Sequence, residues 1–411
     1  MTKNYEALLL DLPLSSPIHD VFTSYLRMEM IKKILLVGFI FVAIFHAIGI
    51  LLPETGFDAL WYHLPIVKDM AVSREIRIVP DVPQSDEPRL GEVMFLPFFV
   101  VGGVVGIKIF TFIVTLALMY WTYRLCQLYL PDSWSLLTTL LIFTFHTIAW
   151  EATSAYVDQI RALMEVGLLV FLLSKSKLSF AQQLIACVLL TASLLTKSVS
   201  VLFIPAWFVL LWQQFNWKVS VTIVGLSLFA LFVTHPSFSI FGSASNQLIV
   251  QTGIIHYVTT QLFSFLVLPL TLSFHAESYM SVIFLFAVPF VWINRKWLLQ
   301  IYRPELLFIA VSLFTWVWIV PVSVRYDLSG LILLTILCVA VVVHSFPKNK
   351  NLKQLFALLL VGNITLNMVI RVGAVVKALP FLLGRESEVE YIKQYDQGIE
   401  KGPIEKWYGI H

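Results

Sequence analysis

The sequence is divided into apolar runs that approach the length of a membrane-spanning helix. A helix needs about 20 apolar residues to cross the hydrocarbon core of a bilayer. Hydrophobic residues make up 58% of the 411 residues and charged residues only 13%, which is far from the composition of soluble domains. We therefore predict an all-α polytopic membrane protein with about 11 transmembrane helices (range 10–13). The predicted spans are residues 34–52, 108–125, 134–150, 159–174, 180–196, 199–215, 219–235, 280–294, 305–321, 328–346 and 353–371.

The distribution of Lys and Arg orients these spans in the membrane. Cytoplasmic loops carry an excess of Lys and Arg, and most of these residues fall on one side when the N-terminus is placed in the cytoplasm. This divides the chain into a cytoplasmic segment 1–33, for which an interfacial helix is one alternative, a transmembrane domain 34–371, and a short extracytoplasmic tail 372–411. The net charge of +3 is small and forms no basic patch, so the sequence predicts membrane lipids as partners and no nucleic acid.

Residues 255–275 do not fit the simple count of spans. The Arg295-Lys296 pair favours an odd number of crossings between residues 234 and 294. We therefore expect 255–275 to be a re-entrant segment, with an additional span as the alternative.

The first extracytoplasmic loop, residues 53–107, holds most of the acidic residues of the membrane region. Eight carboxylates lie between Glu54 and Glu92, whereas most later connections carry one charge or none. The loop opens with the segment Phe57-Asp58-Ala59-Leu60-Trp61-Tyr62-His63-Leu64-Pro65. We predict a helical loop that carries the chemistry of the protein.

Four ionisable residues stand at the outer ends of predicted spans: Asp58, Asp158, Lys197 and Arg325. Charges at membrane depth cost a few kcal/mol or more, so they tend to pair with one another and to face cavities. We expect the four to converge on one face. The alternatives are ordinary ones: either Asp could cap a helix, and Lys197 or Arg325 could extend to the lipid headgroups.

Several other kinds of site are not indicated. The three cysteines stand alone in apolar runs, and the histidines have no metal-binding spacing. No glycine-rich phosphate loop is present, so the energy for a reaction would have to arrive with an activated substrate.

Four stretches together resemble the GT-C superfamily of polyprenyl-phosphate-sugar-dependent glycosyltransferases, in its protein-mannosyltransferase and aminoarabinose-transferase-like branch. The first is Phe57-Asp58 with Tyr62-His63-Leu64-Pro65, and the second is Ala155-Tyr156-Val157-Asp158. The third is Leu195-Thr196-Lys197 and the fourth is Arg325-Tyr326. The resemblance implies a GT-C-like fold and transfer of a sugar from a polyprenyl-phosphate donor to a lipid, glycan or protein acceptor. The resemblance implies an active site on the outer side of the membrane. We expect a bacterial plasma membrane, because the chain is compact and lacks retention signals, with an active site facing the lumen of the endoplasmic reticulum in a eukaryote as the alternative.

The resemblance also implies roles for individual residues. Asp58 would be the general base, Arg325 and Lys197 would stabilise the leaving phosphate, and Asp158 would orient a substrate or hold a divalent cation such as Mg²⁺ or Mn²⁺. Tyr62, His63 and Tyr326 would complete the substrate-binding set. Many members carry paired acids in the first loop, but here Ala59 follows Asp58, so a metal-binding pair is absent at that point.

Two other functions are compatible with the sequence. A secondary transporter or lipid flippase would use Asp58 and Asp158 as coupling sites, although such proteins usually show internal repeats, which this sequence lacks. A non-catalytic protein that binds polyprenyl phosphate in envelope assembly would retain lipid binding without turnover.

Overall fold

The computed structural model describes residues 18–174, 179–235, 254–274, 280–318, 323–346, 349–393 and 407. Within this part of the chain every regular element is a helix. The prediction of an all-α protein is therefore confirmed. Of the predicted terminal segments, residues 1–17, 394–406 and 408–411 lie outside the described residues.

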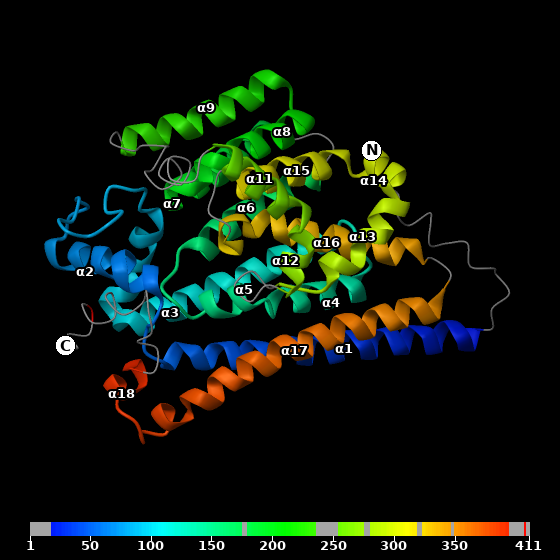
Figure 1. Cartoon of the computed structure of the whole chain (residues 1–411), viewed down its shortest axis with the longest axis horizontal. Helices are drawn as coiled ribbons and strands as arrows, with labels where there is room; N and C mark the ends of the chain where they lie inside the picture. Colours follow the sequence, from blue (N-terminus) through cyan, green and yellow to red (C-terminus); the bar gives the residue numbers. More distant parts are fainter. Residues whose placement is uncertain are drawn as a thin grey trace.

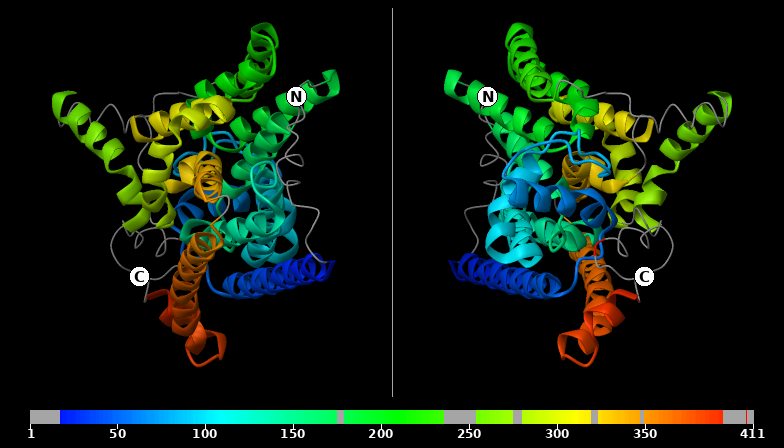
Figure 2. Two further views of the ribbon diagram at one scale, coloured as in Figure 1. Left: turned by 90° about the vertical axis from the view of Figure 1, so that its right-hand side faces the viewer. Right: turned by 90° about the vertical axis from the view of Figure 1, so that its left-hand side faces the viewer.

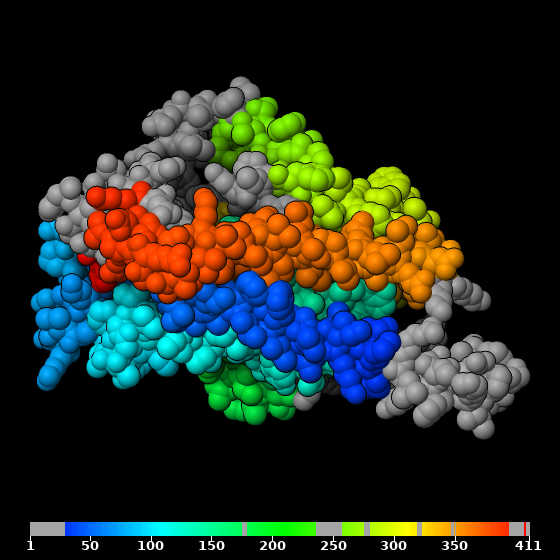
Figure 3. All heavy atoms as spheres, turned by 90° about the horizontal axis from the view of Figure 1, so that it is seen from below, coloured from blue at the N-terminus to red at the C-terminus, as the bar shows by residue number. Residues whose placement is uncertain are grey.

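Two long helices, α1 (Ile18–Ile48) and α17 (Lys350–Leu382), lie side by side along one face of the molecule (Figure 1, Figure 3). Both expose large apolar side chains, such as Val37 (66% exposed) on α1 and Val369 (62% exposed) on α17. A helix hydrogen-bonds all of its interior backbone groups and can present such side chains to lipid. These surfaces are those of an integral membrane protein.

The centre of the bundle is α16 (Leu328–Ser345), which packs against helices from both halves of the chain. In its most apolar stretch of 18 residues, 78% of the residues are buried, compared with 17% in the corresponding stretch of α1 and 33% in that of α17. Figure 2 shows α1 and α17 on one side of the molecule and α7 to α9 on the opposite side. The surrounding helices are α4 (Asp132–Phe143), α5 (His146–Glu151), α6 (Asp158–Leu173), α7 (Phe180–Thr196), η4 (Ser198–Phe203), α8 (Ile204–Gln214), α9 (Trp217–Thr234), α13 (Ile283–Ile293), α14 (Arg295–Ile301), α15 (Arg303–Trp318) and η5 (Val324–Asp327).

Five of the described helices are long and apolar enough to cross a membrane, and two bent helix pairs raise this to seven. Four shorter apolar helices add to these, so the count of eleven spans stays a prediction. One bent pair, α11 (Ile254–Leu266) and α12 (Leu268–Phe274), turns by 67°. A bend of this kind is found in a broken span or a re-entrant loop, so the choice of a re-entrant segment also stays a prediction.

The first loop is built from short helices, as expected. After η2 (Gly49–Leu51) the chain forms η3 (Ala59–His63), a π-helical turn, and then α2 (Leu64–Ser73). The first loop is held close to the bundle by contacts between α2 and α3 (Leu90–Cys126).

The final element, α18 (Glu388–Lys393), lies near α17.

Helix α3 begins well before the predicted span 108–125. Its residues 90–102, expected in the loop, are helical and join the span at a kink at Gly103, where φ is +57°. Glycine adopts this conformation without the steric cost that a Cβ would bring. A Cβ on Gly106 would lie 2.1 Å from the carbonyl oxygen of Phe98, so the bend also requires glycine there.

Candidate active site

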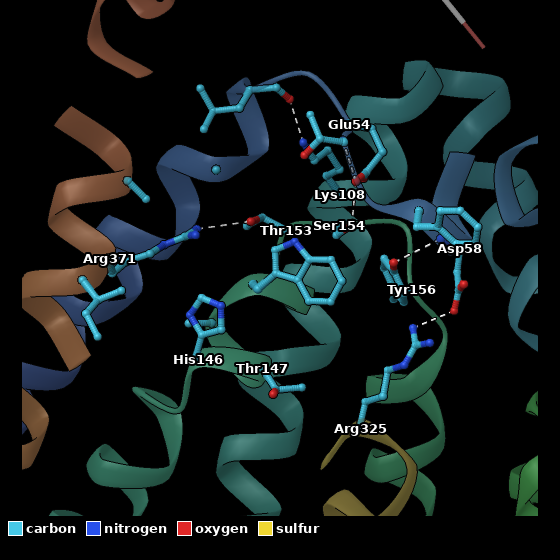
Figure 4. Close-up of a pocket in the computed structure, with 18 of the residues that line it drawn as sticks. Glu54, Asp58, Lys108, His146, Thr147, Thr153, Ser154, Tyr156, Arg325 and Arg371 are labelled. Carbon is cyan, nitrogen blue, oxygen red and sulfur yellow. Dashed lines mark hydrogen bonds and ion pairs between the residues drawn. The ribbon is translucent and has the colours of Figure 1, made fainter. Parts of the chain in front are cut away.

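A cavity of about 720 Å³ lies between the first loop, α3, α5, η5 and α17. The first loop contributes Asp58, η5 contributes Arg325, and the connection before α6 contributes Tyr156 (Figure 4). The charged and polar groups that line it include Glu54, Asp58, Lys108, His146, Ser154, Tyr156, Arg325 and Arg371. The cavity thus combines residues that are far apart in the sequence.

Asp58 and Arg325 form an ion pair at the edge of this cavity. Arg325 Nη1 lies 2.6 Å from Asp58 Oδ2, and the side chains are 17% and 12% exposed. Hydrogen bonds between charged partners at this distance are strong. Both side chains nevertheless line the cavity.

Tyr156 positions both members of this pair. Its hydroxyl oxygen accepts a hydrogen bond of 3.1 Å from the backbone N–H of Asp58. Its ring lies under the Arg325 guanidinium, at 5.3 Å from the ring centroid. A cation over an aromatic face is held there electrostatically. Tyr156 was part of a recognised motif but was not predicted as a site residue.

Buried groups of α6 hold η5 in position. Arg161, which is fully buried, donates from Nη2 to the backbone carbonyl oxygen of Arg325 at 2.7 Å. Its Nε lies 3.8 Å from Glu165 Oε1. Glu165 in turn accepts hydrogen bonds of 2.7 Å from Ser193 and Ser329. This network fixes the backbone that carries Arg325.

Asp158 and Lys197 form a second ion pair behind the first. Lys197 Nζ lies 2.7 Å from Asp158 Oδ2, with side-chain exposures of 9% and 0%. Tyr326 connects the two pairs, because its ring lies 5.1 Å from Lys197 Nζ and 5.0 Å from the Arg325 guanidinium carbon. Its hydroxyl also accepts a hydrogen bond of 3.1 Å from Arg325 Nη2. The four predicted charged residues therefore do converge, as two neighbouring ion pairs.

Not every predicted site residue lines the cavity. Asp158, Lys197 and Tyr326 lie beside it, whereas Tyr62 and His63 pack inside the first loop. His63 Nδ1 lies 2.5 Å from Glu92 Oε1, and both side chains are almost fully buried. This contact ties η3 to the start of α3. The predicted substrate contacts of Tyr62 and His63 remain predictions.

Tyr62 lies close to the two ion pairs without joining the cavity. Burial, followed by the negative charges of Asp58 and Asp158, raises the pKa of its phenol well above the ordinary value. The phenol therefore stays protonated and neutral next to these carboxylates. Its ring packs against Ile66 and Met70 of α2.

Glu54 anchors the start of the loop. Its carboxylate accepts hydrogen bonds from the backbone N–H groups of Gly56 (2.9 Å) and Ala155 (2.9 Å) and from Ser154 Oγ (2.6 Å). A Cβ on Gly56 would lie 2.6 Å from the Tyr156 ring and 2.9 Å from Ser154 Oγ. Glycine is thus needed where the loop approaches the connection before α6.

Two cations that line the cavity were also missed, Lys108 and Arg371. Lys108 lies at the start of a predicted span and Arg371 at the end of another. A cation within an apolar span is a functional candidate by default, so the signal was present in the sequence. Their spacing in the chain gave no indication that they face the same cavity as Arg325.

The described residues contain no group of three or more His, Cys, Asp or Glu side chains arranged to hold a metal ion. The buried carboxylate oxygens without a hydrogen-bond partner among these residues include Asp158 Oδ1 and both oxygens of Glu151. Such oxygens suit Mg²⁺ or Mn²⁺ chemically. A bound divalent cation therefore stays a prediction.

A comparison with solved structures finds two similar chains, both ArnT from Cupriavidus metallidurans. One is bound to undecaprenyl phosphate and the other is in the apo state. Each has a TM-score of 0.55, the sequence identities are 13% and 12%, and each alignment covers 92% of this chain and 77% of ArnT. No family model and no curated protein matches the sequence. At this low identity the likeness shows the fold, and it confirms the prediction of a GT-C-like membrane fold.

Proposed function

We infer that this protein is an inverting glycosyltransferase that moves a sugar from a polyprenyl-phosphate donor to an acceptor hydroxyl or amine. The observation that carries the proposal is the Asp58–Arg325 ion pair of 2.6 Å at the edge of a cavity of about 720 Å³. The GT-C-like fold supports it, as does the undecaprenyl phosphate bound to one ArnT structure. The proposed location is the bacterial plasma membrane, with the cavity on the outer side.

Asp58 is the proposed general base. Its carboxylate accepts the proton of the acceptor group while the acceptor oxygen or nitrogen forms a bond to the anomeric carbon of the sugar. The bond between that carbon and the phosphate oxygen breaks, and polyprenyl phosphate leaves with the bonding electrons. Attack opposite the leaving group inverts the configuration. Phosphate is a stable anion, so the reaction needs no general acid.

Arg325 is the proposed ligand of the donor phosphate. Its guanidinium can bind phosphate oxygens in a bidentate manner and stabilise the charge that develops on them. In the structure this guanidinium is bound to Asp58. We propose that donor phosphate exchanges with the carboxylate, so that one binding event both fixes the donor and releases the base.

Lys197 and Asp158 have proposed roles around this centre. Lys197 contributes positive charge behind Arg325 and holds the Tyr326 ring. If the enzyme uses Mg²⁺ or Mn²⁺, Asp158 Oδ1 and the Glu151 carboxylate would hold it. The ion would supply further neutralisation of phosphate charge.

The direct test is to incubate the purified protein with a panel of polyprenyl-phosphate sugars and candidate lipid, glycan and protein acceptors. The proposal predicts release of polyprenyl phosphate together with glycosylated acceptor. Binding of the lipid without turnover on any member of the panel would favour the non-catalytic alternative. Movement of the intact lipid across a proteoliposome membrane, without cleavage, would favour a flippase.

A further inference from the structure

The proposed reaction leaves one wall of the cavity without a role, the short helix α5. Its residues His146, Thr147 and Trp150 all line the cavity, and Figure 4 shows His146 away from Asp58. His146 is exposed and Trp150 is half-buried, whereas residues 141–145 and 147–149 around them are buried. Polar and aromatic side chains that remain uncovered at the wall of a cavity are the groups that fix a ligand there.

The polar groups of this wall make no hydrogen bond within the described part of the chain. This holds for both ring nitrogens of His146, for Thr147 Oγ1 and for Trp150 Nε1. Thr144 and Asn367 line the same cavity but differ. Asn367 Nδ2 donates to Thr144 Oγ1 at 3.2 Å, and that hydroxyl donates to a backbone carbonyl oxygen at 2.7 Å. The fold thus satisfies these two residues internally and leaves the groups of α5 open to a ligand.

The chemistry of the α5 wall favours an uncharged ligand. The acidic residue of α5, Glu151, is fully buried and does not line the cavity. A hydroxyl, an indole N–H and a neutral imidazole together provide both donors and acceptors of hydrogen bonds. Hydroxyl groups of a ligand match this set, because each of them also donates and accepts. An ammonium group at this wall would instead need a carboxylate partner.

Trp150 adds an aromatic surface close to the reacting groups. Its ring centroid lies 4.7 Å from that of Tyr156, and the two ring planes are inclined at 55°. Tyr156 in turn contacts the backbone of Asp58 and the guanidinium of Arg325. A sugar ring carries C–H groups on its face, which pack on an aromatic ring, and hydroxyls at its edge. A ring packed on Trp150 would therefore lie one side chain away from the Asp58–Arg325 pair.

We propose that His146, Thr147 and Trp150 form a subsite for an uncharged, hydroxylated sugar ring. The ring packs on the indole, and the imidazole and the threonine hydroxyl bind its hydroxyl groups. It belongs either to the polyprenyl-phosphate donor or to a glycan acceptor. Its assignment to a substrate rests on the proposed function, whereas its binding does not. The subsite would select among sugars, because a group placed to bind a hydroxyl disfavours a ring that lacks it.

The test measures binding to the full-length protein in detergent, without any transfer reaction. The probes are a short-chain polyprenyl phosphate, the same lipid carrying glucose, mannose or galactose, and the three methyl glycosides added to protein saturated with the sugar-free lipid. The variants are Trp150→Leu, His146→Ala and Thr147→Val, with Trp150→Phe as the conservative change. Exposed residues outside the cavity provide matched controls, Trp212→Leu on α8 and Thr222→Val on α9.

If the ring belongs to the donor, at least one sugar-bearing lipid binds wild type more tightly than the sugar-free lipid does. Trp150→Leu should weaken its binding about tenfold, and His146→Ala and Thr147→Val about fivefold each. The affinity for sugar-free lipid should stay within about twofold of wild type. If the ring belongs to the acceptor, the same variants weaken binding of a methyl glycoside instead. Trp150→Phe should retain most of the affinity, and both controls should behave as wild type.

The subsite is refuted if no sugar raises the affinity of wild type and no glycoside binds it, or if these affinities are unchanged in the variants. Equal losses for the lipid with and without sugar would refute it as well, since α5 would then only shape the cavity. If Trp150→Leu does not fold, the same comparison in His146→Ala and Thr147→Val decides. Failure of the proposed transfer is a separate result, because a protein that binds the sugar in this way without turnover would keep the subsite.

Discussion

The two ion pairs of the candidate active site have the same chemistry in different surroundings. Asp58–Arg325 and Asp158–Lys197 have nearly equal separations, 2.6 and 2.7 Å. The first pair borders the cavity with partly exposed side chains, whereas Asp158 is fully buried. Access, rather than charge or distance, therefore distinguishes the pair that we propose substrate exchanges from the pair that is buried between helices.

The difference arises from the elements that carry each pair. Asp58 stands at the start of the short η3, in a loop, and Arg325 stands in the short η5. Asp158 instead begins α6, and Lys197 directly follows α7, two helices packed closely together. A pair on short connecting elements can separate at a lower cost than a pair between packed helices.

The largest expected effect is on stability, from Lys197→Met. This change leaves the Asp158 carboxylate buried without its cation, which typically costs about 3–5 kcal/mol. We expect a marked fall in the melting temperature of the detergent-purified protein. The double variant Asp158→Asn/Lys197→Met should recover most of the loss, because it removes both charges.

This prediction also decides between two roles of Lys197. Normal stability of Lys197→Met combined with lost donor binding would show that Lys197 contacts phosphate directly, as the family resemblance implies. The framework role would then be wrong.

Arg325→Lys should affect transfer more than stability. The substitution keeps the charge but removes the planar donor pair that binds phosphate in a bidentate manner. We expect sugar transfer to fall about 10²-fold, with only a small change in melting temperature, since the pair is partly exposed. An unchanged transfer rate would mean that the guanidinium does not act on the leaving phosphate.

Tyr326→Phe should have the smallest effect. It removes the hydroxyl that accepts a hydrogen bond from Arg325 but keeps the ring beside both cations. The loss of one hydrogen bond costs about 1 kcal/mol, so we expect the KM for donor to rise about fivefold with kcat nearly unchanged. Tyr120→Phe, an exposed tyrosine on α3, is the control. A large fall in kcat would instead give Tyr326 a part in the chemical step.

The helical membrane fold could be predicted from the sequence because apolar length and charge placement reflect the bilayer directly. The kink of α3 could not, because it depends on how Gly106 approaches the backbone of Phe98. The number of spans also stays a prediction, since the 67° bend between α11 and α12 fits either a broken span or a re-entrant loop.

The convergence of Asp58, Asp158, Lys197 and Arg325 could be predicted because each stands at the outer end of a span. Their pairing could not, because the sequence does not specify which cation meets which carboxylate. The cavity could not be predicted either, because Tyr156, Lys108 and Arg371 come from separate regions that only the folded bundle brings together.

We propose that Asp58 is the base and that donor phosphate displaces it from Arg325. The most direct measurement is made on one preparation of Asp58→Asn, in which affinity for polyprenyl phosphate and the rate of sugar transfer are determined together. We expect transfer to fall about 10³-fold while the lipid binds as tightly as to wild type or more tightly, because the guanidinium is no longer occupied. Transfer at the wild-type rate, or loss of lipid binding together with transfer in a folded protein, would contradict it.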